Sequence, residues 1–148
     1  MTSSNAGRPA HFDDLAPGQD WGVHVWTATD SFCAQWQEIT GDDLPSYHPS
    51  QETIAAYGGA LLPPSLAWVF LAECIKVLMP LRPPGGIQVR QQLTFFGPIF
   101  QGDTLSTGLH ITGKYIKRGR KYVESFSETR NERGEKVLEG TRVNLWQA

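Results

Sequence analysis

The most apolar stretch of the chain is residues 63–80. Between its flanking prolines only Glu73 and Lys76 are charged, so a helix through this stretch is apolar on almost every face. Pro63 and Pro64 suit a first helical turn, where a backbone N–H has no intrahelical partner, and Pro80 ends the helix. The pattern therefore predicts one long helix that the rest of the chain must cover.

A membrane span is the alternative interpretation of this stretch. A span needs roughly 20 apolar residues, whereas here two prolines, Glu73 and Lys76 interrupt a shorter run. We therefore expect a core helix about 24 Å long, at 1.5 Å per residue, and no contact with a membrane.

Beyond Pro80 the pattern changes from helical to strand-like. Runs rich in β-branched and aromatic residues predict four strands, at residues 87–96, 104–116, 121–130 and 137–146. The turn signals at residues 118–120 and 131–134 predict hairpins. Strands joined by hairpins form an antiparallel meander.

Upstream of the long helix the pattern predicts one strand and two shorter helices. Trp21, Val23 and Val25 alternate with polar or small residues, which is typical of a strand at residues 21–29. Residues 31–39 predict a short helix capped by Thr29 or Asp30, and residues 51–57 a weaker one. The fold class is therefore α+β, an antiparallel β-sheet wrapped around one long central helix.

Length and composition indicate one domain with a small-molecule or protein partner. The 148 residues carry a net charge of −2 and a pI near 6.1, which gives no reason to expect nucleic acid. Cys33 and Cys74 are too few for a disulfide framework or a metal cluster, which fits a cytoplasmic protein without a bound metal. Residues 1–10 are predicted to be a flexible tail without a signal peptide, and residues 11–148 a single domain.

A polar loop at residues 41–49 holds the candidate chemistry. Two carboxylates, a phenol and an imidazole occur within a few positions, on Asp42, Asp43, Tyr47 and His48. Such groups can take up and deliver protons. Exposed turn residues are the structural alternative for Asp42, Asp43 and His48, and ring packing is the alternative for Tyr47.

Three segments in combination resemble the MaoC-like (R-specific) enoyl-CoA hydratase/dehydratase family: residues 39–45, 57–65 and 93–105. The resemblance implies the hot dog fold for residues 11–148. It implies a lyase of fatty acid metabolism that reversibly adds water to a 2-enoyl-CoA thioester, with coenzyme A as part of the substrate and no cofactor. It also implies a tunnel at a subunit interface, in a homodimer, a dimer of dimers or a heteromer with a homologous hydratase chain.

The catalytic motif of that family is Gly-Asp-x-Asn-Pro-x-His, from which this chain departs. Asp42 holds the Asp position, Leu44 replaces Asn, Tyr47 replaces His, and His48 comes one place late. The resemblance implies Asp42 and His48 as the catalytic pair, with Asp43 and Tyr47 as alternates. Because a one-residue slip in an extended segment reverses side-chain direction, His48 is expected to point away from Asp42 unless the loop is remodelled.

The start of the long helix is the predicted substrate-binding position. Unpaired N–H groups and the positive end of the helix dipole stabilise charge on a thioester oxygen. Proline has no N–H, so the donor is expected to be the amide of Ser65 or of the next residue. Gly59, Pro64 and Ser65 are the predicted substrate-binding residues.

Two alternative functions remain open at the level of sequence. Glu73 is a carboxylate within the apolar helix, a position where hot dog thioesterases carry one, so an acyl-CoA thioesterase is one alternative. An ion pair with Lys76 or Arg90 is the structural interpretation of Glu73. The other alternative is a non-catalytic acyl-CoA-binding partner subunit of a hetero-oligomeric hydratase, in which the altered loop marks a lost site.

Overall fold

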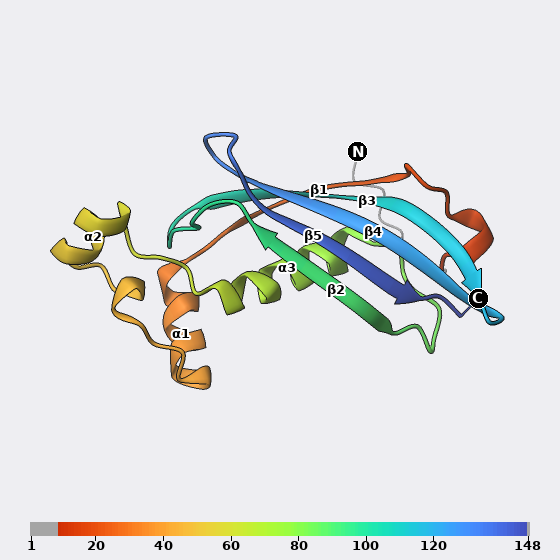
Figure 1. Cartoon of the computed structure of the whole chain (residues 1–148), viewed down its shortest axis with the longest axis horizontal. Helices are drawn as coiled ribbons and strands as arrows, with labels where there is room; N and C mark the ends of the chain where they lie inside the picture. The colour runs from red at the N-terminus through yellow and green to blue at the C-terminus, as the bar shows by residue number, and fades with distance from the viewer. Residues whose placement is uncertain (1–8, 148) are drawn as a thin grey trace.

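The computed structural model describes residues 9–147, and it consists of one antiparallel sheet curved over one long helix (Figure 1). The sheet has five strands in the order β1-β3-β4-β5-β2. Their bounds are Asp20–Thr27 for β1, Gln88–Phe95 for β2, Thr104–Lys117 for β3, Arg120–Asn131 for β4 and Lys136–Leu145 for β5. The predicted α+β class is confirmed.

The last three strands form the predicted meander. Lys117 pairs with Arg120 across a two-residue turn, in which Arg118 and Gly119 have φ of 52° and 74°. Positive φ at both central residues is the turn geometry that matches the twist of a hairpin. β2 does not pair with β3, the next strand in the chain, but with β5. The segment at residues 96–103 therefore leads from the edge strand β2 past β5 and β4 to β3, near the opposite edge of the sheet.

The central helix α3, Pro64–Leu78, lies against the sheet. Its buried residues include Leu66, Leu71 and Ile75. Gly140 of β5 makes room for this contact, since a Cβ at that position would lie 3.1 Å from Leu71 Cδ2. The opposite side of α3 is exposed, with Trp68, Glu73, Lys76 and Val77 in the described chain. The prediction that almost every face would be covered is therefore wrong for the single chain, because one sheet covers only one side of a helix.

Three of the smaller helical elements gather beyond the N-terminal end of α3 (Figure 1). α1, Asp30–Thr40, begins at the cap Thr29 and ends at Gly41, whose φ is 70°. α2, Gln51–Tyr57, begins at the cap Ser50 and ends at Gly58. The 3-10 turns η1, Phe12–Asp14, and η2, Pro45–Tyr47, were not predicted. η2 shapes the polar loop between α1 and α2.

The start of the described chain is attached to the domain. The amide of Ala10 donates to the Leu81 carbonyl at 3.0 Å, and Trp146 Nε1 donates to the Ala10 carbonyl at 2.8 Å. The tail predicted at residues 1–10 thus includes a residue that packs on the domain, and residues 1–8 lie outside the described residues. No helix within residues 9–147 is long and apolar enough to cross a membrane.

Candidate active site

Asp42 reaches the start of α3 through a chain of hydrogen bonds. Ser65, in the first turn of α3, donates from Oγ to Asp42 Oδ2 at 2.9 Å. Trp36 of α1 donates from Nε1 to the same Ser65 Oγ at 3.0 Å. The hydroxyl therefore receives one hydrogen bond and donates another, which fixes its proton toward Asp42. The arrangement places an anchored carboxylate at the helix end where backbone N–H groups are unpaired.

His48 is held by Asp43, not by Asp42. A hydrogen bond joins His48 Nε2 to Asp43 Oδ1. This agrees with the expectation that His48 points away from Asp42: η2 turns the chain at residues 45–47, and the two neighbouring aspartates have different partners. The side chains of His48 and Asp43 are 54% and 56% exposed, so both groups are open to solvent.

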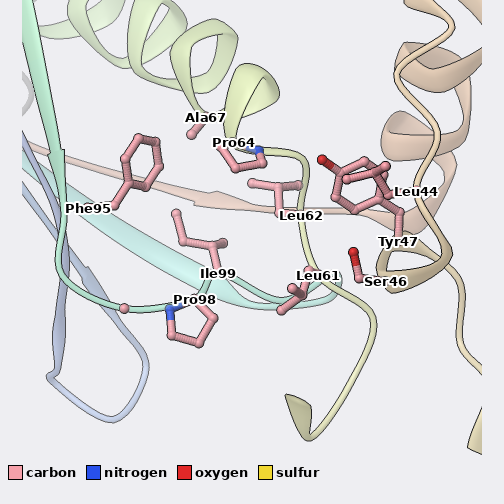
Figure 2. Close-up of a pocket in the computed structure, with 11 residues that line it drawn as sticks. Leu44, Ser46, Tyr47, Leu61, Leu62, Pro64, Ala67, Phe95, Pro98 and Ile99 are labelled. Atoms are coloured by element: carbon pink, nitrogen blue, oxygen red, sulfur yellow. The ribbon is translucent and has the colours of Figure 1, made fainter. Parts of the chain in front are cut away.

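An apolar cavity of about 460 Å³ opens beside this loop (Figure 2). The loop, the entry to α3 and the segment after β2 each contribute to its wall. The lining residues are Leu44, Ser46, Tyr47, Leu61, Leu62, Pro64, Ala67, Phe95, Gly97, Pro98 and Ile99. Asp42, Asp43 and His48 are not among them. The cavity therefore offers room for an apolar group next to the polar loop.

Tyr47 and Ser46 are the polar residues that line this cavity. The ring of Tyr47 is buried, and its hydroxyl points toward Pro64 at the start of α3 (Figure 2). Burial, and secondly the negative charge of Asp42, raise the pKa of the Tyr47 phenol above its ordinary value. The hydroxyl therefore stays protonated at neutral pH and is available as a hydrogen-bond donor.

Gln101 ties the walls of the cavity together. Its Nε2 donates to the carbonyls of Tyr47 at 2.7 Å and Leu61 at 3.0 Å. Asp103 accepts from the Phe100 amide at 2.9 Å and holds the turn that precedes β3. Sequence reasoning missed Gln101 and Trp36 as site residues. Their only signals were membership of the segment at residues 93–105 and helical spacing in α1.

The predicted substrate-binding residues divide into two groups. Pro64 lines the cavity, and Ser65 follows it in the first turn. Leu66 N–H donates to the Pro63 carbonyl at 2.9 Å, so of the two expected amides Ser65 N–H is the better candidate. Gly59 does not line the cavity. A Cβ there would lie 3.2 Å from the Phe100 ring, which explains the glycine by packing.

Glu73 lies on the exposed side of α3 and does not line the cavity. Its carboxylate is 64% exposed and lies 4.0 Å from Lys76 Nζ. This placement agrees with the ion-pair interpretation and gives the thioesterase alternative no geometric support. Such an exposed pair contributes at most about 1 kcal/mol.

Both cysteines are buried side chains. Cys33 and Cys74 are both free, and burial raises the pKa of each thiol to about 11. Thiolate is the form that reacts and binds metals, so both are inert at neutral pH. Within residues 9–147 no three His, Cys, Asp or Glu side chains are grouped closely enough to hold a metal ion.

Comparisons with known proteins agree with this architecture. The sequence model of the family described as "FAS1-like, dehydratase domain region" matches residues 33–140. No curated protein matches the sequence. The (R)-hydratase PhaJ1 of Pseudomonas aeruginosa is 20% identical with a TM-score of 0.74, and the match covers 93% of this chain and 85% of that one.

Two further solved structures extend the likeness. The MaoC-like dehydratase of Rhodospirillum rubrum is 20% identical with a TM-score of 0.71, covering 94% and 98% of the two chains. A chain of the HadBC (3R)-hydroxyacyl-ACP dehydratase complex of Mycobacterium tuberculosis is 18% identical with a TM-score of 0.68, covering 88% and 98%. These similarities confirm the predicted hot dog fold. Because the family match spans residues 33–140, most of the domain, the chain belongs to the family described as FAS1-like, dehydratase domain region, and it has the hot dog fold of the MaoC-like dehydratases.

Proposed function

We propose that the chain adds water reversibly to a 2-enoyl-CoA thioester. The observation that carries the proposal is the Asp42 carboxylate, which Ser65 and Trp36 hold at the N-terminal end of α3 beside an apolar cavity. Hydration needs a base for the attacking water and an acid for the α-carbon, both close to a site that stabilises enolate charge. Asp42 and the first-turn amides of α3 supply the base and the charge-stabilising donors, and we assign the acid to His48 of the same loop.

The two proton transfers are assigned to Asp42 and His48. In the hydration direction, Asp42 takes a proton from water as the oxygen bonds to C3, and the protonated imidazole of His48 delivers a proton to C2. Asp43 orients the His48 ring through its hydrogen bond. In dehydration the same groups exchange roles, as microscopic reversibility requires.

Two hydrogen-bond donors are assigned to stabilise the negative charge that develops on the thioester oxygen. The Ser65 amide lies in the first turn of α3, where the helix dipole is positive. The Tyr47 hydroxyl, kept protonated by burial, points toward the same turn (Figure 2). The acyl chain would occupy the apolar cavity, between Leu61 and Ile99.

Hydration of crotonyl-CoA tests the proposal through loss of the enoyl absorbance. Asp42→Asn and His48→Ala should each lower kcat by about 10²–10⁴, as is typical for removal of one proton-transfer group. Glu73→Gln is the matched control, because it neutralises an exposed carboxylate outside the cavity and should leave kcat unchanged. Hydration that survives both Asp42→Asn and His48→Ala would refute the assignment. Thiol release from acetyl-CoA that Glu73→Gln abolishes would favour the thioesterase instead.

A second candidate is a non-catalytic acyl-CoA-binding subunit of a heteromeric hydratase. It is favoured by one observation: His48 and Asp43 are both more than half exposed, and neither lines the cavity. One similar structure, HadBC, is itself a complex of two chains. Absence of hydration by the pure chain, together with co-purification of a homologous chain bearing the intact motif, would select this candidate.

We also propose that the chain assembles in the cytoplasm as a homodimer or a dimer of dimers. β2 is an edge strand, and its side chains Val89 and Phe95 are exposed, as is the outer side of α3 with Trp68 and Val77. An exposed apolar strand edge is a site for pairing with another chain. Light scattering should give at least twice the 16.4 kDa chain mass. A monomer at micromolar concentration would contradict the proposal.

A further inference from the structure

A second cavity, of about 570 Å³, lies at the other end of α3 from the polar loop. The last turns of α3, the Pro-Pro-Gly-Gly loop after it and the start of β2 surround this cavity, at the end of the molecule opposite α1 and α2 (Figure 1). Its polar lining side chains are Lys76, Arg82, Gln88 and Arg142, and no Asp or Glu contributes to its lining. The cavity is therefore positively charged.

Arg142 forms the floor of this cavity. It projects from β5, two residues beyond Gly140, and the residue is only 9% exposed. One of its terminal nitrogens donates to Gln91 Oε1 at a long 3.4 Å, and the guanidinium lies 5.3 Å from the centre of the Trp68 ring. Its Nε is buried and has no hydrogen-bond partner. No carboxylate pairs with Arg142 within the described chain.

Arg82 brings a second guanidinium to the same cavity. It donates to Asn144 Oδ1 at 3.2 Å. Burial, and secondly the positive charge of Arg82, lower the pKa of Arg142 to about 10. A buried cation without a counter-charge is costly, and a like charge beside it adds to the cost. An anion between the two guanidinium groups would relieve both.

Ser125 adds an unsatisfied hydroxyl beneath Arg142. The two residues are register partners on β4 and β5, and both line a small space under α3 that is too narrow to hold a water molecule. The buried Ser125 Oγ has no partner, like Arg142 Nε. Buried polar atoms without partners are uncommon in folded proteins and indicate a missing acceptor or donor. Of these two residues only Arg142 also lines the second cavity, so its guanidinium is the group that can meet a ligand there.

We propose that this second cavity binds a phosphate-bearing ligand, whose oxygens accept hydrogen bonds from Arg82 and Arg142. A phosphate monoester, with a charge near −2, balances two guanidinium groups, whereas a single carboxylate leaves one uncompensated. Trp68 supplies an aromatic wall for the rest of the ligand. The phosphate can belong to a free metabolite or to the carrier of a thioester. The site is distinct from the Asp42 loop and does not require hydratase activity.

Calorimetry on the full chain, with ionic strength fixed by sodium chloride, tests the site with inorganic pyrophosphate, coenzyme A and phosphate-free pantetheine. Arg82→Gln should weaken pyrophosphate binding at least about tenfold, since a hydrogen bond to a charged group is lost. Arg120→Gln is the matched control, because it removes an exposed arginine from the β3–β4 hairpin. Binding of coenzyme A but not pantetheine, with the same sensitivity to Arg82→Gln, identifies the carrier phosphate. Binding of pyrophosphate alone identifies a free phosphate ligand.

Arg142→Met provides a second measurement that does not depend on affinity. Because it removes an unpaired buried charge and keeps much of the side-chain volume, it should raise Tm in phosphate-free buffer. It should also abolish the rise in Tm that pyrophosphate causes in the wild-type chain. Equal weakening by Arg82→Gln and Arg120→Gln, or no pyrophosphate binding by the wild type, would overturn the proposal. If the wild type binds no anion and the Arg82 or Arg142 variants instead change the mass found by light scattering, these arginines would contact a second copy of the chain.

Discussion

The contact between α3 and the sheet can be tested at Gly140. A Cβ added there would lie 2.6 Å from Ser127 Oγ, 3.1 Å from Leu71 Cδ2 and 3.3 Å from Leu93 Cδ2. Carbon atoms pack best at about 3.5–4.0 Å, so three neighbours on different elements must move. Overpacking of this kind costs about 1–3 kcal/mol. Replacement of glycine also stiffens the unfolded chain, which offsets about 0.4–1 kcal/mol.

Urea denaturation of Gly140→Ala should therefore show a loss of about 1–2 kcal/mol in the free energy of unfolding. The signal is intrinsic fluorescence, since the chain has five tryptophans. Gly97→Ala is the matched control, because nothing lies within 4 Å of its added Cβ. The control should be neutral or slightly stabilising. Both variants are measured at one protein concentration, since assembly contributes to apparent stability.

A double-mutant cycle identifies the cause of the loss. Ser127→Ala removes the oxygen that the new methyl would approach most closely, and it gives up only a long hydrogen bond of 3.4 Å to the Gly140 carbonyl. The double variant should recover on the order of 1 kcal/mol relative to the sum of the single changes. If Gly140→Ala behaves like Gly97→Ala, α3 does not pack on β5 as described, and the reasoning fails.

Three further predictions follow from individual side chains. Phe70 stacks on Trp26 with ring centroids 3.9 Å apart but is only partly buried. Phe70→Ala should therefore lower the free energy of unfolding in chemical denaturation by about 2–3 kcal/mol, less than the loss of a fully buried aromatic. Lys117→Ala should leave it almost unchanged. Trp36→Phe removes the donor to the first turn of α3 and should lower kcat for enoyl-CoA hydration about tenfold with little change in KM; an unchanged kcat would contradict that role. Burial raises the pKa of both cysteine thiols from 9.0 to about 11, so a thiol reagent at pH 8 should label them only after unfolding. The free energy of unfolding should also fall as pH rises from 9 to 11, because the thiols of the unfolded chain ionise first in that range. Rapid labelling of the native chain at pH 8 would contradict the burial.

The elements were predictable where local signals agree with each other. The long helix has a proline start and a proline stop around an apolar run, and α1 and α2 carry Ser or Thr caps before and glycines after. The four C-terminal strands have β-branched patterns between glycine turns. Each of these features acts within a few residues, so the sequence alone contains it.

The arrangement of these elements was less accessible. That β2 pairs with β5 depends on contacts across the sheet, which no local pattern encodes. The exposed side of α3 carries both charged residues of the helix, Glu73 and Lys76, but also the large apolar side chains of Trp68 and Val77. The sequence shows how apolar a helix is, but it does not show which sides of the helix the sheet will bury.

Long-range contacts limited the prediction of the site in the same way. Gln101 lies 54 positions from Tyr47, whose carbonyl it binds. Trp36 lies 29 positions from Ser65. Neither residue type suggests catalysis, and both act by holding other groups in place. Such positioning residues become visible only when the fold brings their partners within hydrogen-bond distance.

The one-residue slip in the polar loop has a consistent structural consequence. Neighbouring residues of an extended segment point to opposite sides, and here Asp42 turns to Ser65 while Asp43 turns to His48. The shift therefore does not break a histidine–aspartate pair; it moves the pair one position along the chain. The place of the family histidine is taken by Tyr47, a buried phenol at the cavity wall. The loop thus retains an anchored carboxylate and an imidazole, but it presents a neutral hydroxyl, not a ring nitrogen, to the apolar cavity. The crotonyl-CoA experiment tests whether hydration proceeds with the loop altered in this way.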